Sequence, residues 1–263
     1  KTAYEIMPSL VGSEMCIRDS GWITGDFKDS WWQKRPAFDL VKQRIMPTLK
    51  LAAASMAIAI PIGIWLGALG ARRPGSWSDR LTTGVALFGV STIEFWMALM
   101  LIWFVAIQWG LVPTSGAGTS AAIILPAITL AFRPLGRIAQ VTRSTLTDVL
   151  SKPYIKSARA KGLSENRILR VYGFKNAAIP VFTLCGDELI AFINGAVVVE
   201  TIFAWPGMGS LIVSAVLKRD LPLIEASVFV IAILVIATNL VVDLAYTILD
   251  PKISFRRKKA EKQ

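Results

Sequence analysis

Apolar residues in this chain gather in five long runs that are separated by polar and basic stretches. A helix needs about 20 mainly apolar residues to cross the hydrocarbon core of a bilayer, and each run is at least that long. The pattern therefore predicts an all-α membrane protein with five transmembrane helices. We expect them at about 45–70, 81–109, 121–141, 176–199 and 223–249, the third being interrupted by Arg133 and Pro134.

The sequence before the first span has two parts. The first 20 residues show neither helical nor strand periodicity, and the run from Pro8 to Ser20 resembles translated sequencing-adapter reads, so we treat this part as non-native; a genuine irregular terminus is the alternative. The second part is polar and rich in Trp, which suits an extracytoplasmic or interfacial segment with a helix that ends near Arg44. The predicted domains are this non-native segment, the interfacial segment, a transmembrane domain and a basic tail, at 1–20, 21–44, 45–250 and 251–263.

Positive charge is distributed unevenly between the loops, in a chain whose net charge is +11. Nineteen lysines and arginines fall in 71–80, in 133–175 and after Pro251, whereas only Lys218 and Arg219 fall in the loops of the other side. The positive-inside bias places the first group in the cytoplasm. Five spans with a cytoplasmic C-terminus put the start of the first span outside, so we expect a sixth span upstream.

Composition excludes several classes of function. The chain is 54% hydrophobic and has no histidine, so no His-ligated metal site and no histidine general base is expected. Its two cysteines are Cys16 and Cys185, and the second lies in an apolar run, which argues against a disulfide framework. The basic residues lie between apolar runs without a basic and aromatic groove for nucleic acid. We therefore predict no metal, no cofactor and no nucleic-acid partner.

The segment 151–170 is polar and basic although it lies between long apolar runs. Pro153 suits the first turn of a helix, which we expect to run through Lys161. Gly162 then suits a left-handed C-cap, and Ser164 can cap a second helix that begins at the next residue. Small residues in the first helix permit close docking, and its basic residues favour an acidic partner. The alternative is a solvated basic loop that only satisfies the positive-inside bias.

The run 154–164, together with Arg170 and 176–180, resembles the cytoplasmic coupling motif of ABC-importer permeases. Further stretches are similar to the B-type permease of the dipeptide/oligopeptide/nickel branch, and they are 110–116, 199–209, 219–222, 242–246 and 249–251. The resemblance covers about 21–255. It implies that an ATPase is contacted by Tyr154, Lys156, Ala158, Arg159, Ala160, Gly162, Leu163 and Ser164. Lys156 stands where the broader family often has Glu, although this branch commonly lacks it.

The resemblance implies a type I ABC-importer permease fold of six spans, five of them present here, with a cytoplasmic coupling helix. Such a subunit would lie in the inner membrane of a bacterium or archaeon, surrounded by lipid. Its partners would be a homologous C-type permease, two cytoplasmic ATPases and an extracytoplasmic solute-binding protein. The chain has no P-loop, so we expect no enzymatic activity of its own. The cargo would be a peptide, a nickel complex or a glutathione-like solute.

Three acidic residues lie inside predicted spans: Glu94, Asp187 and Glu188. A carboxylate at the bilayer centre costs about 2.5–3.5 kcal/mol, so such residues usually face a bundle interior or a watery path. We expect these acids to line the translocation path and to favour a cationic or amine-bearing solute. Pairing with a basic residue of the partner permease, or protonation, is the alternative.

Two other classes compete with a permease subunit. A self-sufficient secondary transporter or channel would show inverted repeats or broken helices, which the pattern does not reveal. An intramembrane enzyme would need a Ser/His, paired-Asp or metal constellation, and none is present. Trp205, after the fourth span, is interpreted as an interface anchor, with an outer gate or a binding-protein contact as alternatives.

Overall fold

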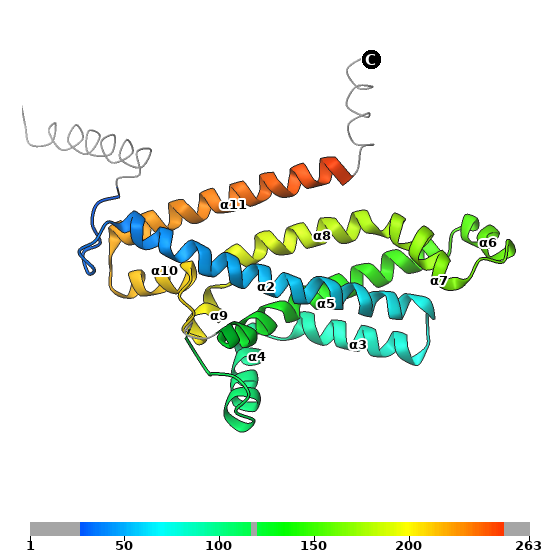
Figure 1. The fold of residues 1–263 in the computed structure, drawn as a ribbon, viewed down its shortest axis with the longest axis horizontal. Coiled ribbons are helices and arrows are strands. Elements are labelled where there is room, and N and C mark those ends of the chain that lie inside the picture. Colours follow the sequence, from blue (N-terminus) through cyan, green and yellow to red (C-terminus); the bar gives the residue numbers. More distant parts are fainter. Residues whose placement is uncertain (1–26, 117–119, 250–263) are drawn as a thin grey trace, which may run out of the picture.

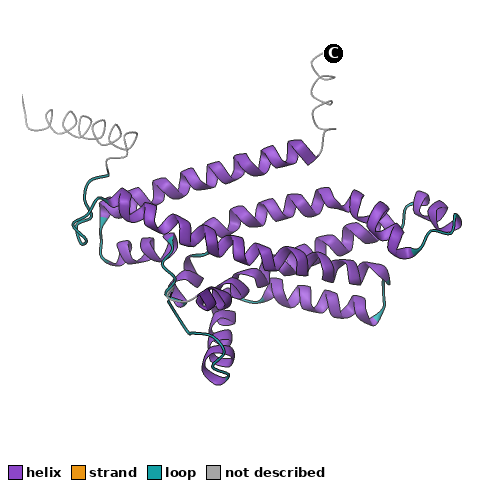
Figure 2. Cartoon of the chain, in the orientation of Figure 1, coloured by secondary structure: helices purple, strands orange, loops and turns teal. Residues whose placement is uncertain are grey.

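The computed structural model describes residues 27–116 and 120–249, and these are almost entirely helical. Short loops join the helices (Figure 2), and the only β pairing within the described residues is one antiparallel bridge between Asp29 and Pro36. The molecule is elongated, with α6 (Pro153–Ala160) at one end and α10 (Met208–Leu217) towards the other (Figure 1). The predicted segments 1–20 and 251–263 lie outside the described residues.

The first described helix, α2 (Ala37–Arg72), unites two segments that the pattern had separated. The predicted helix end near Arg44 is wrong, because α2 passes Arg44 without a break. It also continues through Pro47 and Pro61. A proline in a membrane helix is tolerated because neighbouring groups can satisfy the freed backbone carbonyl. The interfacial segment and the first span therefore share one helix.

The second predicted span is broken, and the break was not expected. It comprises three elements, α3 (Trp77–Ser91), α4 (Glu94–Leu101) and the π-helical η1 (Ile102–Gln108), with a bend of 104° after α3. The hydroxyl of Thr92 donates to the carbonyl oxygen of Phe88 at 2.6 Å, and both Thr92 and Ile93 have extended backbone. A side chain that bonds to the helix backbone in this way competes with continuation of the helix.

The third predicted span is longer than expected. A short 3-10 turn, η2 (Ser120–Ile123), leads into α5 (Ile124–Leu150), and Pro134 is buried inside this continuous helix instead of interrupting it. Arg133, Arg137 and Arg143 consequently lie on α5 and not in a cytoplasmic loop, which corrects the charge count. The basic residues that follow α5 still leave this end of the molecule the more positive one.

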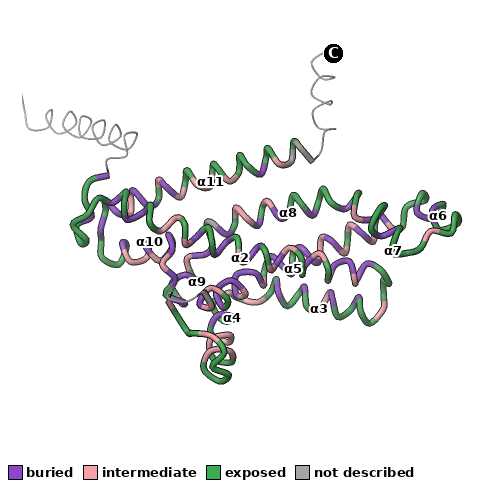
Figure 3. The backbone as a smooth tube through the Cα atoms, viewed as in Figure 1, coloured by how far each residue is buried: buried purple, intermediate pink, exposed green. Residues whose placement is uncertain are grey.

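The core is centred on α2 and α5, which approach each other closely. A Cβ added to Gly67 on α2 would lie 2.6 Å from the carbonyl oxygen of Ala139 on α5. Likewise a Cβ on Gly136 of α5 would lie 2.5 Å from the carbonyl oxygen of Ala86 on α3. Glycine at these crossings is thus what allows the helices to pack. By contrast, α11 (Leu221–Leu249) is packed only along its first part, and few of its described residues beyond Val230 are buried (Figure 3).

The second half of the chain contains α7 (Glu165–Arg167), the π-helical η3 (Ile168–Gly173), α8 (Phe174–Gly195) and α9 (Val197–Ile202) before α10 and α11. The first three follow one another directly and form one helical stretch. The sequence pattern had left 200–222 as a loop, so α10 was missed. Its ten residues are apolar but rise only about 15 Å, too short to cross a bilayer.

Within the described residues, three helices are long and apolar enough to cross a membrane: Ala37–Arg72, Ala121–Leu150 and Leu221–Ala245. The broken pair α3 and α4 would form a fourth span. The 22 residues of α8 extend about 33 Å, which also suffices, although two acidic residues lie near its middle. Each of the five predicted spans falls on one of these stretches. We call the α6 end the inner end and the α9–α10 end the outer end, after the predicted topology.

Candidate functional site

The predicted coupling segment forms a small capped helix that projects at the inner end (Figure 1). Pro153 is the first residue of α6 and follows Lys152 as N-cap, while Lys161 is the C-cap. Gly162 comes next with φ of +77°, in the left-handed region that glycine adopts without strain. The predicted order of helix, glycine and second helix is therefore confirmed.

Ser164 occupies the N-cap position of the second helix, as predicted, although its side chain makes no capping hydrogen bond. Its carbonyl oxygen accepts a hydrogen bond from the amide of Ile168 at 3.0 Å. This bond opens the helical stretch that continues through η3 into α8. The coupling segment is thus directly joined to a predicted span.

One face of α6 packs against other residues of the same chain. Ile155 and Ala158 are 0% and 6% exposed, and they form a small apolar cluster with the buried Ile168 of η3. Leu150 and the half-buried Leu163 pack against this cluster. Ala158 is therefore covered within the chain and can act on a partner only by holding α6 in place.

The opposite face of α6 is exposed to solvent. The residues of the predicted ATPase contact that are exposed are Tyr154, Lys156, Arg159, Ala160, Gly162 and Ser164. The Nε and Nη2 atoms of Arg159 donate to the two carboxylate oxygens of Glu165 at 2.7 and 3.2 Å. This guanidinium lowers the pKa of Glu165, and the carboxylate raises the pKa of Arg159. The pair bridges α6 and α7 across Gly162.

A polar contact also ties α6 to the start of α8. The side-chain amide of Asn176 donates to the Tyr154 hydroxyl at 3.4 Å and to the carbonyl oxygen of Tyr172 at 2.8 Å. α6 is therefore linked to the same helical stretch in two ways, through the Tyr154 hydroxyl and through the apolar cluster of Ile155 and Ala158 with Ile168. A displacement of α6 would be carried into α8.

The three predicted path acids lie in different surroundings. Glu94 begins α4 at the broken span, and its Oε1 lies 3.7 Å from Nη1 of Arg133. Glu188 on α8 accepts a hydrogen bond from Nη1 of Arg137 at 2.5 Å, and only 5% of its side chain is exposed. Asp187, in contrast, is exposed. The structure therefore brings Glu94 and Glu188 to one face of α5 and leaves Asp187 on the surface beside them.

Glu94 and Glu188 pair with arginines of the same chain, Arg133 and Arg137, which sequence reasoning missed. Arg133 and Arg137 had been assigned to a loop because span 121–141 was thought to be interrupted at Pro134. A usable signal was present, because the two arginines are four residues apart and so share one helix face. The expectation that the acids favour an amine-bearing solute stays a prediction.

A second buried carboxylate site at the outer end was also missed. Glu200 on α9 is 0% exposed, and its carboxylate accepts hydrogen bonds from the Thr48 hydroxyl at 2.7 Å and the Ser210 amide at 3.1 Å. Thr48 in turn accepts from the amide of Met208 at 2.8 Å. This network joins α9, α10 and α2. A Cβ on Gly207 would overlap the Glu200 carboxylate, so a side chain there would push this carboxylate away from its hydrogen-bond partners.

Two further contacts complete the outer end. Trp205 is only 7% exposed and its Nε1 donates to the carbonyl oxygen of Pro47 at 3.1 Å, so its interpretation as an interface anchor is wrong. Asp220 is 1% exposed and accepts hydrogen bonds from the Ser30 hydroxyl at 2.5 Å and the Trp31 amide at 3.2 Å. The segment before α2 is therefore fixed to the turn between α10 and α11.

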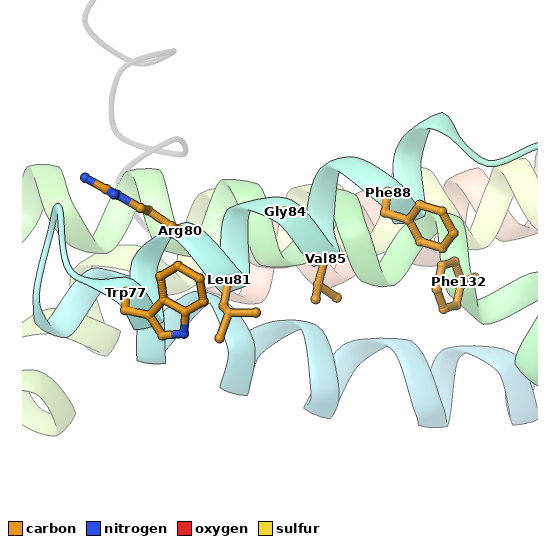
Figure 4. A pocket seen from close by; sticks show the side chains of 7 residues that line it. All are labelled: Trp77, Arg80, Leu81, Gly84, Val85, Phe88 and Phe132. Atoms are coloured by element: carbon orange, nitrogen blue, oxygen red, sulfur yellow. The ribbon is translucent and has the colours of Figure 1, made fainter.

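A surface groove of about 420 Å³ lies along α3, away from both predicted sites (Figure 4). Its walls are apolar apart from Arg80 and are formed by Trp77, Arg80, Leu81, Gly84, Val85, Phe88 and Phe132. Such a surface suits lipid or another helix and carries no reactive group. Among residues 27–116 and 120–249, no group of three or more His, Cys, Asp or Glu side chains could hold a metal ion.

Comparison with known proteins identifies a family match and several relatives in sequence. Residues 59–255 match the family described as "Binding-protein-dependent transport system inner membrane component". The chain is 39% identical over 244 residues to the oligopeptide transport system permease protein AppB of Bacillus subtilis (strain 168), covering 89% of this chain and 77% of that protein. It is 38% identical over 237 residues to the glutathione transport system permease protein GsiC of Escherichia coli (strain K12), covering 90% and 78%.

Solved structures share the fold at lower identity. An inward-facing structure of the MetNI methionine ABC transporter matches with a TM-score of 0.68 at 18% identity, over 80% of this chain and 96% of that chain. An amino acid ABC transporter crystallised with histidines matches with a TM-score of 0.63 at 16% identity, over 79% and 93%. These likenesses confirm the predicted type I ABC-importer permease fold.

Proposed function

The chain belongs to the family of binding-protein-dependent transport system inner membrane components, and we propose that it is the permease subunit of an ATP-driven importer of peptides or a related small solute. Its relatives are permease subunits and not enzymes, and in this family the ATPase is a separate subunit. The names of relatives that transport oligopeptides and glutathione support the substrate class.

The observation that carries the proposal is the placement of α6. On one face of the helix, Ile155 and Ala158 pack on Ile168, so α6 holds its position without a partner. On the opposite face, Lys156, Arg159 and other polar groups are exposed. A basic helix that packs on its own chain along one face and is exposed along the other suits docking into an acidic groove of an ATPase.

The same geometry supports a route for coupling. From Glu165 to Gly195 the chain is helical, a distance of about 46 Å at 1.5 Å per residue. Glu188 and its ion pair with Arg137 lie on this stretch. Movement of α6 would therefore shift charges near the middle of the membrane as part of a rigid element, which is how ATP binding could bias opening and closing.

The remaining partners follow from this role. We propose a homologous C-type permease, two cytoplasmic ATPases and an extracytoplasmic solute-binding protein, in a bacterial or archaeal cell membrane. The exposed apolar surface of α11 and of the groove on α3 offers area for lipid and for the second permease. Glu94, Asp187 and Glu188 would lie along the path between the two permeases.

Docking can be tested by placing bulk on the exposed face of α6. Ala160→Trp should reduce co-purification of the ATPase at least tenfold, because the indole would hold the two surfaces apart without disturbing the Ile155 cluster, a loss of about 1.4 kcal/mol or more. Leu217→Trp, on the exposed surface of α10 at the opposite end of the molecule, is the control and should leave the ATPase bound. Normal ATPase binding and ATP-dependent uptake in Ala160→Trp would contradict the docking role.

A self-sufficient secondary transporter or channel is the second candidate, and the broken span of α3 and α4 is a feature such proteins also use. Proteoliposomes separate the two. A permease of this family should take up peptide only with ATP, the ATPases and the binding protein present. Uptake driven by an ion gradient through this chain alone would support the second candidate.

A further inference from the structure

Four charged side chains meet where α4, α5 and α8 pass one another. Glu94 pairs with Arg133, and Glu188 pairs with Arg137. Arg133 and Arg137 are four residues apart on α5, so the two pairs lie about one helical turn from each other. The glutamate side chains are 25% and 5% exposed, whereas those of the arginines are 53% and 43% exposed. Within the two pairs the guanidinium groups are therefore more exposed than the glutamate carboxylates, and the exposed Asp187 lies beside them.

The cluster lies near the middle of a span. Arg133 is 13 residues from the start of the helical stretch at Ser120, and Arg137 is 13 residues from its end at Leu150. Each distance is about 20 Å along the helix axis. Charged side chains at this depth are costly against hydrocarbon and face a bundle interior or a watery cavity. This face of α5 is therefore turned away from lipid.

The break in the second span points the same way. Thr92 and Ile93 have extended backbone beside Glu94, and Ile93 is 72% exposed, so this chain does not cover the break. Non-helical backbone at membrane depth is tolerated where it is buried in protein or lines a water-filled cavity. An irregular backbone and a half-exposed arginine pair thus meet at one place.

We propose that Arg133 and Arg137 form a carboxylate subsite in the translocation path, which binds the C-terminal carboxylate of a peptide. The inference rests on the proposed function and names a substrate group for the same path. A guanidinium has five N–H donors in a planar fork that matches a carboxylate, and the shortest contacts with Glu94 and Glu188 are made by Nη1 of each arginine.

The two glutamates explain why such a subsite would release its ligand. They balance the two positive charges of the arginines, so an incoming carboxylate gains hydrogen bonds without forming an ion pair with an unpaired guanidinium. A path needs binding that is favourable enough to enter and weak enough to leave. Glu94 and Glu188 are thus positioning residues for the arginines.

Chemical modification tests the subsite without requiring transport. The purified complex of permeases and ATPases, without nucleotide, is treated with phenylglyoxal, and modified arginines are quantified by mass spectrometry. Arg133 and Arg137 should react, and trialanine with a free carboxylate should slow their reaction several-fold while trialanine amide should not. The exposed Arg73 is the internal reference. Failure of both arginines to react, or equal protection by acid and amide, would overturn the subsite.

Transport supplies the second readout. In proteoliposomes, Arg137→Gln with Glu188→Gln removes one ion pair without leaving an unpaired charge. The uptake ratio of trialanine to its amide should fall about tenfold, since hydrogen bonds to a charged group are lost. Arg143→Gln with Asp79→Asn removes the third ion pair of α5, which lies outside the cluster, and should keep the ratio. An unchanged ratio in the first variant would refute the subsite alone, whereas absent ATP-dependent uptake in the wild type would refute the proposed function.

Discussion

The inner and outer ends of this molecule use polar groups in opposite ways. At the outer end, Glu200 and Asp220 are buried and hydrogen-bonded within the chain, and even Trp205 is covered. At the inner end, α6 leaves its polar groups exposed, and the Arg159–Glu165 pair lies on the surface. The polar groups of the outer end are thus satisfied within the chain, whereas one face of α6 stays exposed, and this is the face that we propose docks on an ATPase.

This difference is also one of stability. A buried carboxylate needs every one of its hydrogen bonds, because an unsatisfied buried group costs free energy. An exposed ion pair contributes about 0–1 kcal/mol, since water already solvates both charges. Changes at the buried carboxylates of the outer end should therefore destabilise the protein, whereas changes on the exposed face of α6 should affect docking with little effect on global stability.

The largest effect is expected at Gly207. Gly207→Ala would place a methyl group against the buried Glu200 carboxylate, and forcing that group to move should lower the free energy of unfolding by about 3 kcal/mol. Gly84→Ala is the matched control, because an added Cβ there meets nothing within 4 Å. Thermal unfolding in detergent measures both. Equal melting temperatures for the two variants would contradict the expectation that the outer end depends on its buried carboxylate for stability.

An intermediate and local effect is expected at Ile155. Ile155→Ala should lower the local stability of α6 by about 2 kcal/mol, because it opens a cavity in the small cluster with Ala158 and Ile168. Hydrogen exchange should rise in 153–161 while α2 and α5 stay protected, since their core cluster is separate. Lys156→Ala is the exposed neighbour used as control. A matching rise in exchange across α5 would show that the inner end is not independent.

The smallest effect is expected at the surface ion pair. Glu165→Gln should change the free energy of unfolding by less than about 1 kcal/mol. Because Arg159 lowers the folded-state pKa of Glu165, the contribution is present above the unfolded-state pKa of about 4.3 and is lost as pH falls through the folded value. Hydrogen exchange around Gly162, followed from pH 7 downwards in wild type and variant, measures this. A larger loss, or one that appears above pH 6, would contradict it.

The number and order of helices could largely be predicted from the sequence. The apolar runs fixed five helical stretches, and Pro153, Gly162 and Ser164 fixed the coupling segment to within a residue. These signals are local, because helix capping and span length depend on neighbouring residues. The break at Thr92 and the short α10 were missed, since both lie in runs whose composition alone does not distinguish a span from a bend.

The candidate site was only half accessible to sequence reasoning. The exposed face of α6 follows from helical spacing, but the burial of Ala158 requires Ile168, ten residues away. The acids Glu94 and Glu188 were identified as unusual, yet their partners Arg133 and Arg137 lie 39 and 51 residues from them. Pairing across such separations is set by the packing of α5 against α4 and α8, which no local pattern encodes.

The sequence by itself determined a helical membrane protein with a capped, basic helix between two of its spans, and its motifs identified the permease family. Span length, charge asymmetry and capping are properties of short segments, so they can be identified without knowledge of the tertiary structure. Only the tertiary structure decided which charges meet inside the membrane and which carboxylates are buried at the outer end. Those outcomes depend on glycines such as Gly67 and Gly136, which let α2, α3 and α5 approach closely and so fix which side chains face one another.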